Sequence, residues 1–238
     1  MVDLTAEMAQ LWASLGPVPR APGGVGLGRV IQFVAAHCGE GTSTVARELA
    51  RFAAAHARRP VWLVDLDVPD SPQYAAAAAD ARLYGPLGQA ATASPDGSAF
   101  FTVQPPAIGP DGKPWRDARY LVAHPMGGPN LWVTRFRREA LRPDQAVHVM
   151  PTGSYWSAMR RHAELVVVDA PAAARSQAAF TIAPFVDCTV LVVAAQEGDV
   201  AGPAAVRDGL MAAGGHCAGV VFNRARVEPP KFLKALLS

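Results

Sequence analysis

Residues 30–50, VIQFVAAHCGEGTSTVARELA, decide the fold. Residues 30–35 form a short apolar run typical of a buried strand, and residues 43–59 carry apolar side chains at helical spacing. The loop of residues 37–42, with two glycines, lies between them. Pro60 ends the helical pattern, and residues 61–64 form a second apolar run. This order of strand, glycine loop, helix and strand is the building unit of a parallel sheet.

The rest of the chain alternates in the same way. Strands are predicted over residues 165–168, 189–193 and 220–222, and helices over residues 154–162 and 201–213. Residues 68–150 are harder to interpret. There the sequence predicts a helical turn at 75–79, an exposed loop at 105–114 and a short strand at 131–134. Because the strands are nearly all apolar, we predict an α/β fold with a doubly wound, mostly parallel sheet and helices on both faces.

The two ends of the chain contain further short patterns. Apolar residues from Leu4 to Leu15 recur at helical spacing and predict a helix that stops at Gly16. Residues 18–28 are rich in proline and glycine and are expected to be a linker. Its GGVGLG run precedes the first strand, so a dinucleotide loop is disfavoured. Residues 231–237 are expected to form a short amphipathic helix packed on the domain.

Composition restricts the class of protein but assigns no activity. The chain has 238 residues and a mass of 25.0 kDa, which suits one sizeable domain. Half of the residues are hydrophobic, yet no uncharged run reaches the roughly 20 residues of a spanning helix. The first residues lack the pattern of a signal peptide. The net charge of +2 gives no reason to expect nucleic acid, and three cysteines show no metal-binding spacing. We therefore expect a cytoplasmic protein.

Polar groups follow the predicted strands at four points, and such ends meet at one edge of a parallel sheet. The first is the glycine loop, where a helix N-terminus offers free N–H groups to an anion. The others are Asp65 with Asp67, Asp169, and Asn223 with Arg224. A phosphate loop with strand-end aspartates is the arrangement expected for a nucleotide with Mg²⁺.

The metal ligands can be assigned from the same pattern. Ser43 would bind Mg²⁺ directly through its hydroxyl, while Asp67 and Asp169 would hold its waters. Each aspartate taken alone is equally well explained as a cap or turn residue. Their occurrence together, in order and after strands, favours the metal site.

Four segments together resemble bacterial tyrosine kinases, the ATPases of capsule and exopolysaccharide systems. The loop resembles their deviant phosphate loop P-G-E-G-K-S-T, VWLVDLD resembles their Walker A′ segment, and ELVVVDAPA their Walker B segment. The segment from FVDCTV to FNR resembles their last strand–helix–strand, which ends beside adenine. The wider superfamily includes ParA/MinD-type ATPases. The resemblance covers residues 30–224 and is weak in the middle third. It implies an N-terminal helix and linker over 1–28 and a P-loop NTPase-like domain over 29–238.

The resemblance also implies a set of roles. ATP or ADP with Mg²⁺ would be the cofactors, Asp65 and Asp67 the catalytic carboxylates. The nucleotide-binding residues would be Gly39, Glu40, Gly41, Thr42, Ser43, Thr44, Asn223 and Arg224. The partner would be the cytoplasmic part of a membrane polysaccharide co-polymerase, or chain-length regulator. That partner would place the protein at the inner membrane, in a homo- or hetero-oligomer without nucleic acid.

Several positions depart from the family pattern. Thr42 stands where the family has the phosphate-loop lysine, which stabilises charge on the phosphates. His37 occupies the place of the ParA/MinD-type signature lysine, and Cys38 replaces a proline and is expected to be buried. The family's tyrosine cluster is missing from the last residues, and its E-x-x-R-x-x-R ring-forming helix from residues 4–15. These departures predict a catalytically impaired regulatory protein that still binds nucleotide.

Three other functions remain open from the sequence. An active ATPase or kinase could take its positive charge from Arg47, from Arg175 or from residues 135–138. The basic segment 135–142 is otherwise expected to be a solvated face. A dinucleotide-binding oxidoreductase could use Gly39, Gly41 and Asp65, although Thr44 breaks its glycine pattern. A ParA/MinD-type positioning ATPase would carry an unrelated cargo.

Overall fold

The computed structural model describes residues 4–16, 27–109, 112–195 and 200–225, and all structural statements below concern these ranges. Its main sheet has eight strands in the order β10-β9-β1-β8-β2-β6-β5-β3, and β4 pairs separately with β7. The strands are β1 (Arg29–Val34), β2 (Val61–Asp65), β3 (Ala91–Thr92), β4 (Phe101–Gln104), β5 (Leu121–Pro125), β6 (Leu131–Phe136), β7 (Ala146–Val149), β8 (Leu165–Asp169), β9 (Cys188–Ala194) and β10 (Cys217–Asn223).

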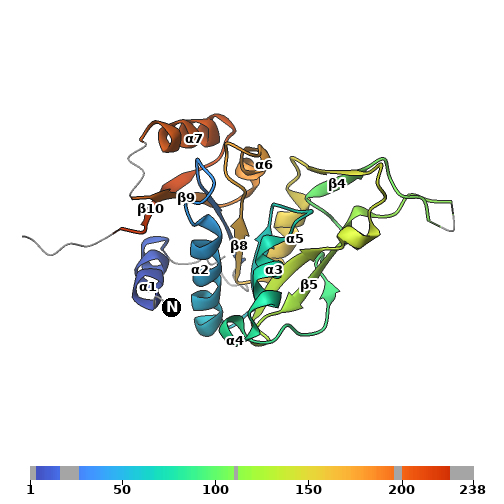
Figure 1. The fold of residues 1–238 in the computed structure, drawn as a ribbon, viewed down its shortest axis with the longest axis horizontal. Helices are drawn as coiled ribbons and strands as arrows, with labels where there is room; N and C mark the ends of the chain where they lie inside the picture. Colours follow the sequence, from blue (N-terminus) through green and yellow to red (C-terminus); the bar gives the residue numbers. More distant parts are fainter. Residues whose placement is uncertain (1–3, 17–26, 110–111, 196–199, 226–238) are drawn as a thin grey trace, which may run out of the picture.

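Helices cover both faces of the sheet (Figure 1). They are α1 (Thr5–Ser14), α2 (Thr42–His56), α3 (Pro72–Ala79), α4 (Ala81–Tyr84), α5 (Ser154–His162), α6 (Ala178–Ile182) and α7 (Ala201–Ala212), with short 3₁₀ turns η1 (Asp117–Tyr120), η2 (Arg138–Ala140) and η3 (Ala183–Phe185). Side chains of α1, α2 and α3 share one apolar cluster with one face of the strands. Side chains of α5, α6 and α7 share a second cluster with the other face.

The central strands are buried because their side chains are apolar on both faces. Every residue of β2, β8 and β9 is buried. All pairs among β10, β9, β1, β8, β2 and β6 are parallel. The predicted fold class is therefore confirmed. The parallel arrangement brings the carboxyl ends of β1, β2 and β8 together at the edge where ligands bind in such sheets.

The chain between residues 85 and 150 contains β3 to β7, and of these strands the sequence predicted β6. β5 runs antiparallel to both β6 and β3, and β4 runs antiparallel to β7. These strands lie at the opposite side of the molecule from β10 and α7 (Figure 1). The short strand expected at 131–134 is present as β6 and continues to Phe136. The segment 135–142 is split between β6, which holds Arg135, and the η2 turn.

Element boundaries differ from the predictions by a few residues. α2 ends at His56 rather than at residue 59, because the backbone N–H groups of Arg58 and Arg59 donate to Glu164 Oε2 at 2.9 and 3.0 Å. The predicted N-terminal helix is present as α1. Arg29 Nη1 donates to the carbonyl oxygen of Leu15 at 2.6 Å and so ties the end of α1 to β1. Most of the expected linker and the helix expected at 231–237 lie outside the described residues.

Candidate functional site

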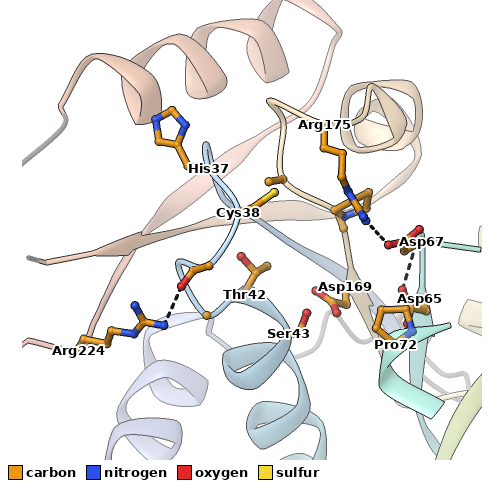
Figure 2. Close-up of a pocket in the computed structure, with 15 residues that line it drawn as sticks. His37, Cys38, Thr42, Ser43, Asp65, Asp67, Pro72, Asp169, Arg175 and Arg224 are labelled. Carbon is orange, nitrogen blue, oxygen red and sulfur yellow. Dashed lines mark hydrogen bonds and ion pairs between the residues drawn. The ribbon is translucent and has the colours of Figure 1, made fainter. Parts of the chain in front are cut away.

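A cavity of about 360 Å³ lies at the carboxyl ends of β1, β2 and β8, and we call it the phosphate-loop cavity. Of the predicted nucleotide-binding residues, Gly39, Gly41, Thr42, Ser43 and Arg224 line it. All predicted catalytic and metal-binding carboxylates also line it, namely Asp65, Asp67 and Asp169. Figure 2 shows Thr42 and Ser43 at the start of α2, with the carboxylates beside them.

The loop before α2 is shaped by glycines and by a buried carboxylate. Gly39 and Gly41 have φ angles of 87° and 90°, a region that glycine enters readily and other residues do not. The carboxylate of Glu40 is buried behind the loop, where it accepts hydrogen bonds from the backbone N–H groups of His37 (2.9 Å) and Ala194 (3.4 Å). Glu40 therefore supports the loop from behind and does not line the cavity.

The end of β10 holds the same loop from the other side. Asn223 Nδ2 donates to the carbonyl oxygen of Glu40 at 2.8 Å, and Arg224 Nη2 donates to that of Gly39 at 2.8 Å. A Cβ atom on Gly41 would lie 2.0 Å from Asn223 Nδ2, so only glycine fits there. Asn223 thus positions the loop, whereas Arg224 lines the cavity itself. Thr44 is exposed and is not among the residues that line the cavity.

Two carboxylates stand opposite each other on neighbouring strands. Asp65 ends β2 and Asp169 ends β8, in register with one another. They are 2% and 3% exposed, so both are almost wholly removed from water. Burial and the nearby charge of Asp169 hold the pKa of Asp65 well above its usual value. Burial likewise raises the pKa of Asp169 to about 6, against the lowering effect of Ser43 and Gln73.

Gln73, in the first turn of α3, connects these groups, and the sequence did not single it out. Its backbone N–H donates to Asp65 Oδ2 at 2.9 Å. Its side-chain Nε2 donates to Asp169 Oδ2 at 2.7 Å and to the Ser43 carbonyl oxygen at 2.9 Å. Pro72 could have indicated Gln73 in the sequence, because proline favours the first position of a helix. A helix that starts there, shortly after Asp67, places Gln73 in its first turn near the strand ends.

The carboxylates have unequal hydrogen bonding. Both oxygens of Asp65 accept backbone N–H bonds, from Gln73 and from Asp67. Asp169 Oδ1, in contrast, is buried and has no hydrogen-bond partner among the described residues. A buried carboxylate oxygen without a donor is costly unless a cation or water meets it. Ser43, Asp67 and Asp169 therefore offer hard oxygen ligands that fit Mg²⁺, with phosphate oxygens and waters completing its shell.

The described residues contain no cluster of three or more His, Cys, Asp or Glu able to hold a metal ion alone. This is compatible with Mg²⁺, which is usually bound by one or two carboxylates together with the substrate phosphates. An ion at this place would therefore depend on the nucleotide. The assignment of Ser43, Asp67 and Asp169 as metal ligands stays a prediction.

The candidate arginines occupy different environments. Arg47 is 9% exposed and does not line the cavity, because its Nε donates to Gln73 Oε1 at 2.7 Å and its Nη1 to the Tyr84 hydroxyl at 2.8 Å. Half-buried Arg135 pairs with Glu139 and exposed Arg138 with Asp70, and neither arginine lines the cavity. Arg175 lines the cavity and pairs with Asp67 (Figure 2).

The expectation for Cys38 was wrong. The Cys38 side chain is exposed and lines the cavity, because the chain leaves β1 at residue 34 and turns outward before Gly39. His37 is exposed as well and lines the same cavity. Thr42, in contrast, is 9% exposed at the first position of α2.

Comparison with known proteins supports the fold. No protein-family model and no curated protein matches this sequence. Among solved structures, the kinase domain of VpsO matches with a TM-score of 0.52 and 17% identity, over 84% of this chain and 86% of that one. The chimerical protein CapA2B2 matches with a TM-score of 0.51 and 17% identity, over 86% and 78% of the two chains.

The kinase domain of the Escherichia coli tyrosine kinase Etk also matches, with 14% identity over 85% of this chain and 70% of that one, but its TM-score of 0.46 carries no argument. Likeness to the VpsO kinase domain and to CapA2B2 at this level of identity shows the fold, so the fold implied by the resemblance is confirmed. No described helix has the length and apolar character needed to cross a membrane.

Proposed function

We propose that this chain is a P-loop protein of an exopolysaccharide or capsule system that binds ATP or ADP with Mg²⁺ but transfers phosphate poorly. The observation that carries the proposal is the unpartnered, buried Oδ1 of Asp169, beside the Ser43 hydroxyl at the start of α2. Asp169 and Ser43 line a cavity bordered by a helix N-terminus, which favours an anion. A metal–phosphate group would satisfy both the oxygen and the free N–H groups.

The impairment follows from position 42. Lysine occurs in this chain only at positions 113, 231 and 234, so none is near the phosphate loop in the sequence. Thr42 can donate a hydrogen bond but carries no charge. Loss of one preorganised group that stabilises developing charge costs roughly 10²–10³ in rate. Binding is less affected, because backbone N–H groups and Mg²⁺ do not depend on this side chain.

The biological role proposed here rests on the fold of the neighbours. We propose that the chain acts as a regulatory partner of the cytoplasmic part of a membrane chain-length regulator, peripheral to the inner membrane. The fold it shares with the kinase domains of VpsO and CapA2B2 supports this proposal. Co-purification with such a regulator, with and without nucleotide, tests it.

The test of the nucleotide proposal is Thr42→Lys. We expect the unaltered chain to bind MgADP and MgATP by calorimetry and to release phosphate slowly. Thr42→Lys is expected to raise phosphate release by about 100-fold. Thr102→Lys, on β4 outside the cavity, adds the same charge and should change nothing. Failure of the unaltered chain to bind nucleotide at millimolar concentration would reduce it to a scaffold.

A second candidate is an active ATPase or kinase in which an arginine replaces the lysine. Arg175 favours it, since it is the one of the proposed arginines that lines the cavity. In that case phosphate release by the unaltered chain is fast, Thr42→Lys changes it little, and Arg175→Gln abolishes it. The two candidates therefore give opposite results in the same assay.

A further inference from the structure

The ion pair between Arg175 and Asp67 joins two residues that line the phosphate-loop cavity (Figure 2). Arg175 belongs to the loop after β8, and Asp67 to the loop after β2. The backbone of the Arg175 loop is fixed, since the N–H groups of Ala173 and Ala174 donate to the carbonyl oxygens of Ala35 and Ala36 at 2.9 and 3.1 Å. Any movement of the guanidinium must therefore come from the side chain alone.

Little besides Asp67 holds this guanidinium. Among the described residues, Asp67 is the one hydrogen-bond partner of the Arg175 side chain, and the two side chains are 52% and 20% exposed. The difference from Arg47 is large, because Arg47 is buried, bonded to two side chains and stacked over the Tyr84 ring. Arg175 is thus a cation with a single anchor.

There is room on both sides of the pair. Asp67, Pro171 and Arg175 line the phosphate-loop cavity and also a neighbouring cavity of about 440 Å³. Residues of β7 and of the chain before α6, among them His148 and Gln177, line only this second cavity. A guanidinium between two open spaces can turn from one partner to another without displacing packed side chains.

Asp67 can pair either with the Arg175 guanidinium or with Mg²⁺, and the role given to Mg²⁺ rests on the proposed function. We propose that Arg175 binds Asp67 when the site holds no divalent cation and binds the nucleotide phosphates when the cation is present. Without a divalent cation it is held by Asp67. With Mg²⁺ beside Ser43, Asp67 and Asp169, it turns to the nucleotide phosphates and supplies part of the charge that Thr42 lacks. Arg175 is thereby a phosphate-binding residue whose availability depends on the metal.

The electrostatics favour this exchange. A dication near Asp67 weakens the hold of that carboxylate on the guanidinium and repels the guanidinium itself. A phosphate group in the cavity that Arg175 lines would then compete for the guanidinium, and Asp70 is the other carboxylate that acts on it. A guanidinium fork matches phosphate oxygens bidentately, which gives a strong, charge-assisted contact. Metal binding and phosphate binding become coupled, each strengthening the other.

The experiment measures ADP affinity by calorimetry, with Mg²⁺ and with a chelator, for the unaltered chain, Arg175→Gln and Arg175→Lys. Arg207→Gln is the matched control, since Arg207 is 54% exposed and paired with Asp208 on α7. We expect Arg175→Gln to weaken binding of MgADP about tenfold, as for loss of a charge-assisted hydrogen bond, and metal-free ADP less than about twofold. Arg175→Lys should lie in between.

A second pair of variants isolates the exchange itself. Asp67→Asn releases the guanidinium without any metal, so metal-free ADP should bind several-fold more tightly. Adding Arg175→Gln to Asp67→Asn should remove that gain. A thermal melt on each variant separates these effects from unfolding.

Each result of these titrations either supports or contradicts the exchange of Arg175 between Asp67 and phosphate. An equal loss of affinity with and without Mg²⁺ means that Arg175 contacts phosphate in both states, and this overturns the exchange. No loss in either state overturns it too. Absence of any ADP binding by the unaltered chain contradicts the proposed function itself, which makes the two failures distinguishable.

Discussion

The two ends of the phosphate-loop cavity are stabilised by different interactions. At the loop end, Gly39, Glu40 and Gly41 are fixed by hydrogen bonds from Asn223, Arg224 and backbone N–H groups. At the carboxylate end, Asp65, Asp67 and Asp169 crowd together, and Arg175 neutralises Asp67. The shape of the loop end is held by hydrogen bonds within the protein, whereas the carboxylate end retains an unpartnered oxygen. This difference indicates that the shape of the phosphate loop does not depend on a lysine at position 42.

Gly41→Ala is expected to have the largest effect on stability and on nucleotide binding, because it disrupts the hydrogen-bonded phosphate loop. A Cβ at φ 90° costs about 1–2 kcal/mol of backbone strain, and it would displace Asn223 from its bond to Glu40, at about 1 kcal/mol more. The free energy of unfolding should fall by about 2–3 kcal/mol in urea titrations, with nucleotide binding weakened more than tenfold.

Gly39→Ala is the matched control, since Gly39 has a φ of 87° with nothing within 4 Å of the added Cβ. It should cost only the backbone strain. Equal losses for the two variants would contradict the close approach of Asn223 to Gly41.

The carboxylate end predicts an intermediate effect that depends on pH. The pKa of Asp169 rises from 3.8 in the unfolded chain to about 6 in the fold, chiefly through burial. The folded chain therefore binds more protons between these values. The contribution of Asp169 to the free energy of unfolding is therefore largest below about pH 4 and is lost as pH rises through about pH 6. Burial raises the pKa of Asp65 as well, so its contribution to stability has the same pH dependence.

Asp169→Asn removes one of these groups and should reduce that pH dependence. Above about pH 7 it should stabilise the fold by about 1–3 kcal/mol, while abolishing the effect of Mg²⁺ on ADP affinity. Urea titrations across this pH range measure the first effect and calorimetry the second. Asp208→Asn, at a 64% exposed side chain, is the control. An unchanged pH slope in Asp169→Asn would contradict a raised pKa of Asp169 in the folded chain.

The smallest effect is expected away from both ends, at Arg138. Its Nη1 lies 2.8 Å from Asp70 Oδ1, but the side chains are 70% and 56% exposed. Such pairs contribute about 0–1 kcal/mol. Arg138→Ala should leave both the melting temperature and ADP affinity almost unchanged. A clear loss of ADP affinity would make the basic segment 135–142 part of the site.

The parallel half of the fold could be predicted from the sequence because its signals are local and strong. β1, β2, β8, β9 and β10 are apolar runs, and the polar residues at their ends meet as parallel pairing requires. The antiparallel strands were missed because they are short and mixed in polarity. β3 has two residues, both exposed, and β7 has no buried residue. The β3–β5 and β4–β7 pairings join residues far apart in the chain, which no local pattern encodes.

The site was predictable to a similar degree. Strand-end position located the carboxylates, but the sequence gives no side-chain directions. It therefore could not separate Arg47, bound to Gln73 and Tyr84, from Arg175, which lines the cavity. The roles of Glu40 and Gln73 as supports were hidden for the same reason. The prediction that Cys38 is buried was wrong because it assumed that the loop after β1 belongs to the core.

The position of β10 has a consequence for the dynamics of the site. Among the strands that the structure describes, β10 lies at the edge of the sheet and pairs with β9, and Val220 and Phe222 on it are 46% and 65% exposed. Edge strands with little burial open locally at a small fraction of the global unfolding free energy. Since Asn223 ends this strand and holds the Glu40 carbonyl, each fraying of β10 also releases the phosphate loop. Any contact that covers β10 would thereby slow the opening of the loop and act on nucleotide affinity from outside the cavity.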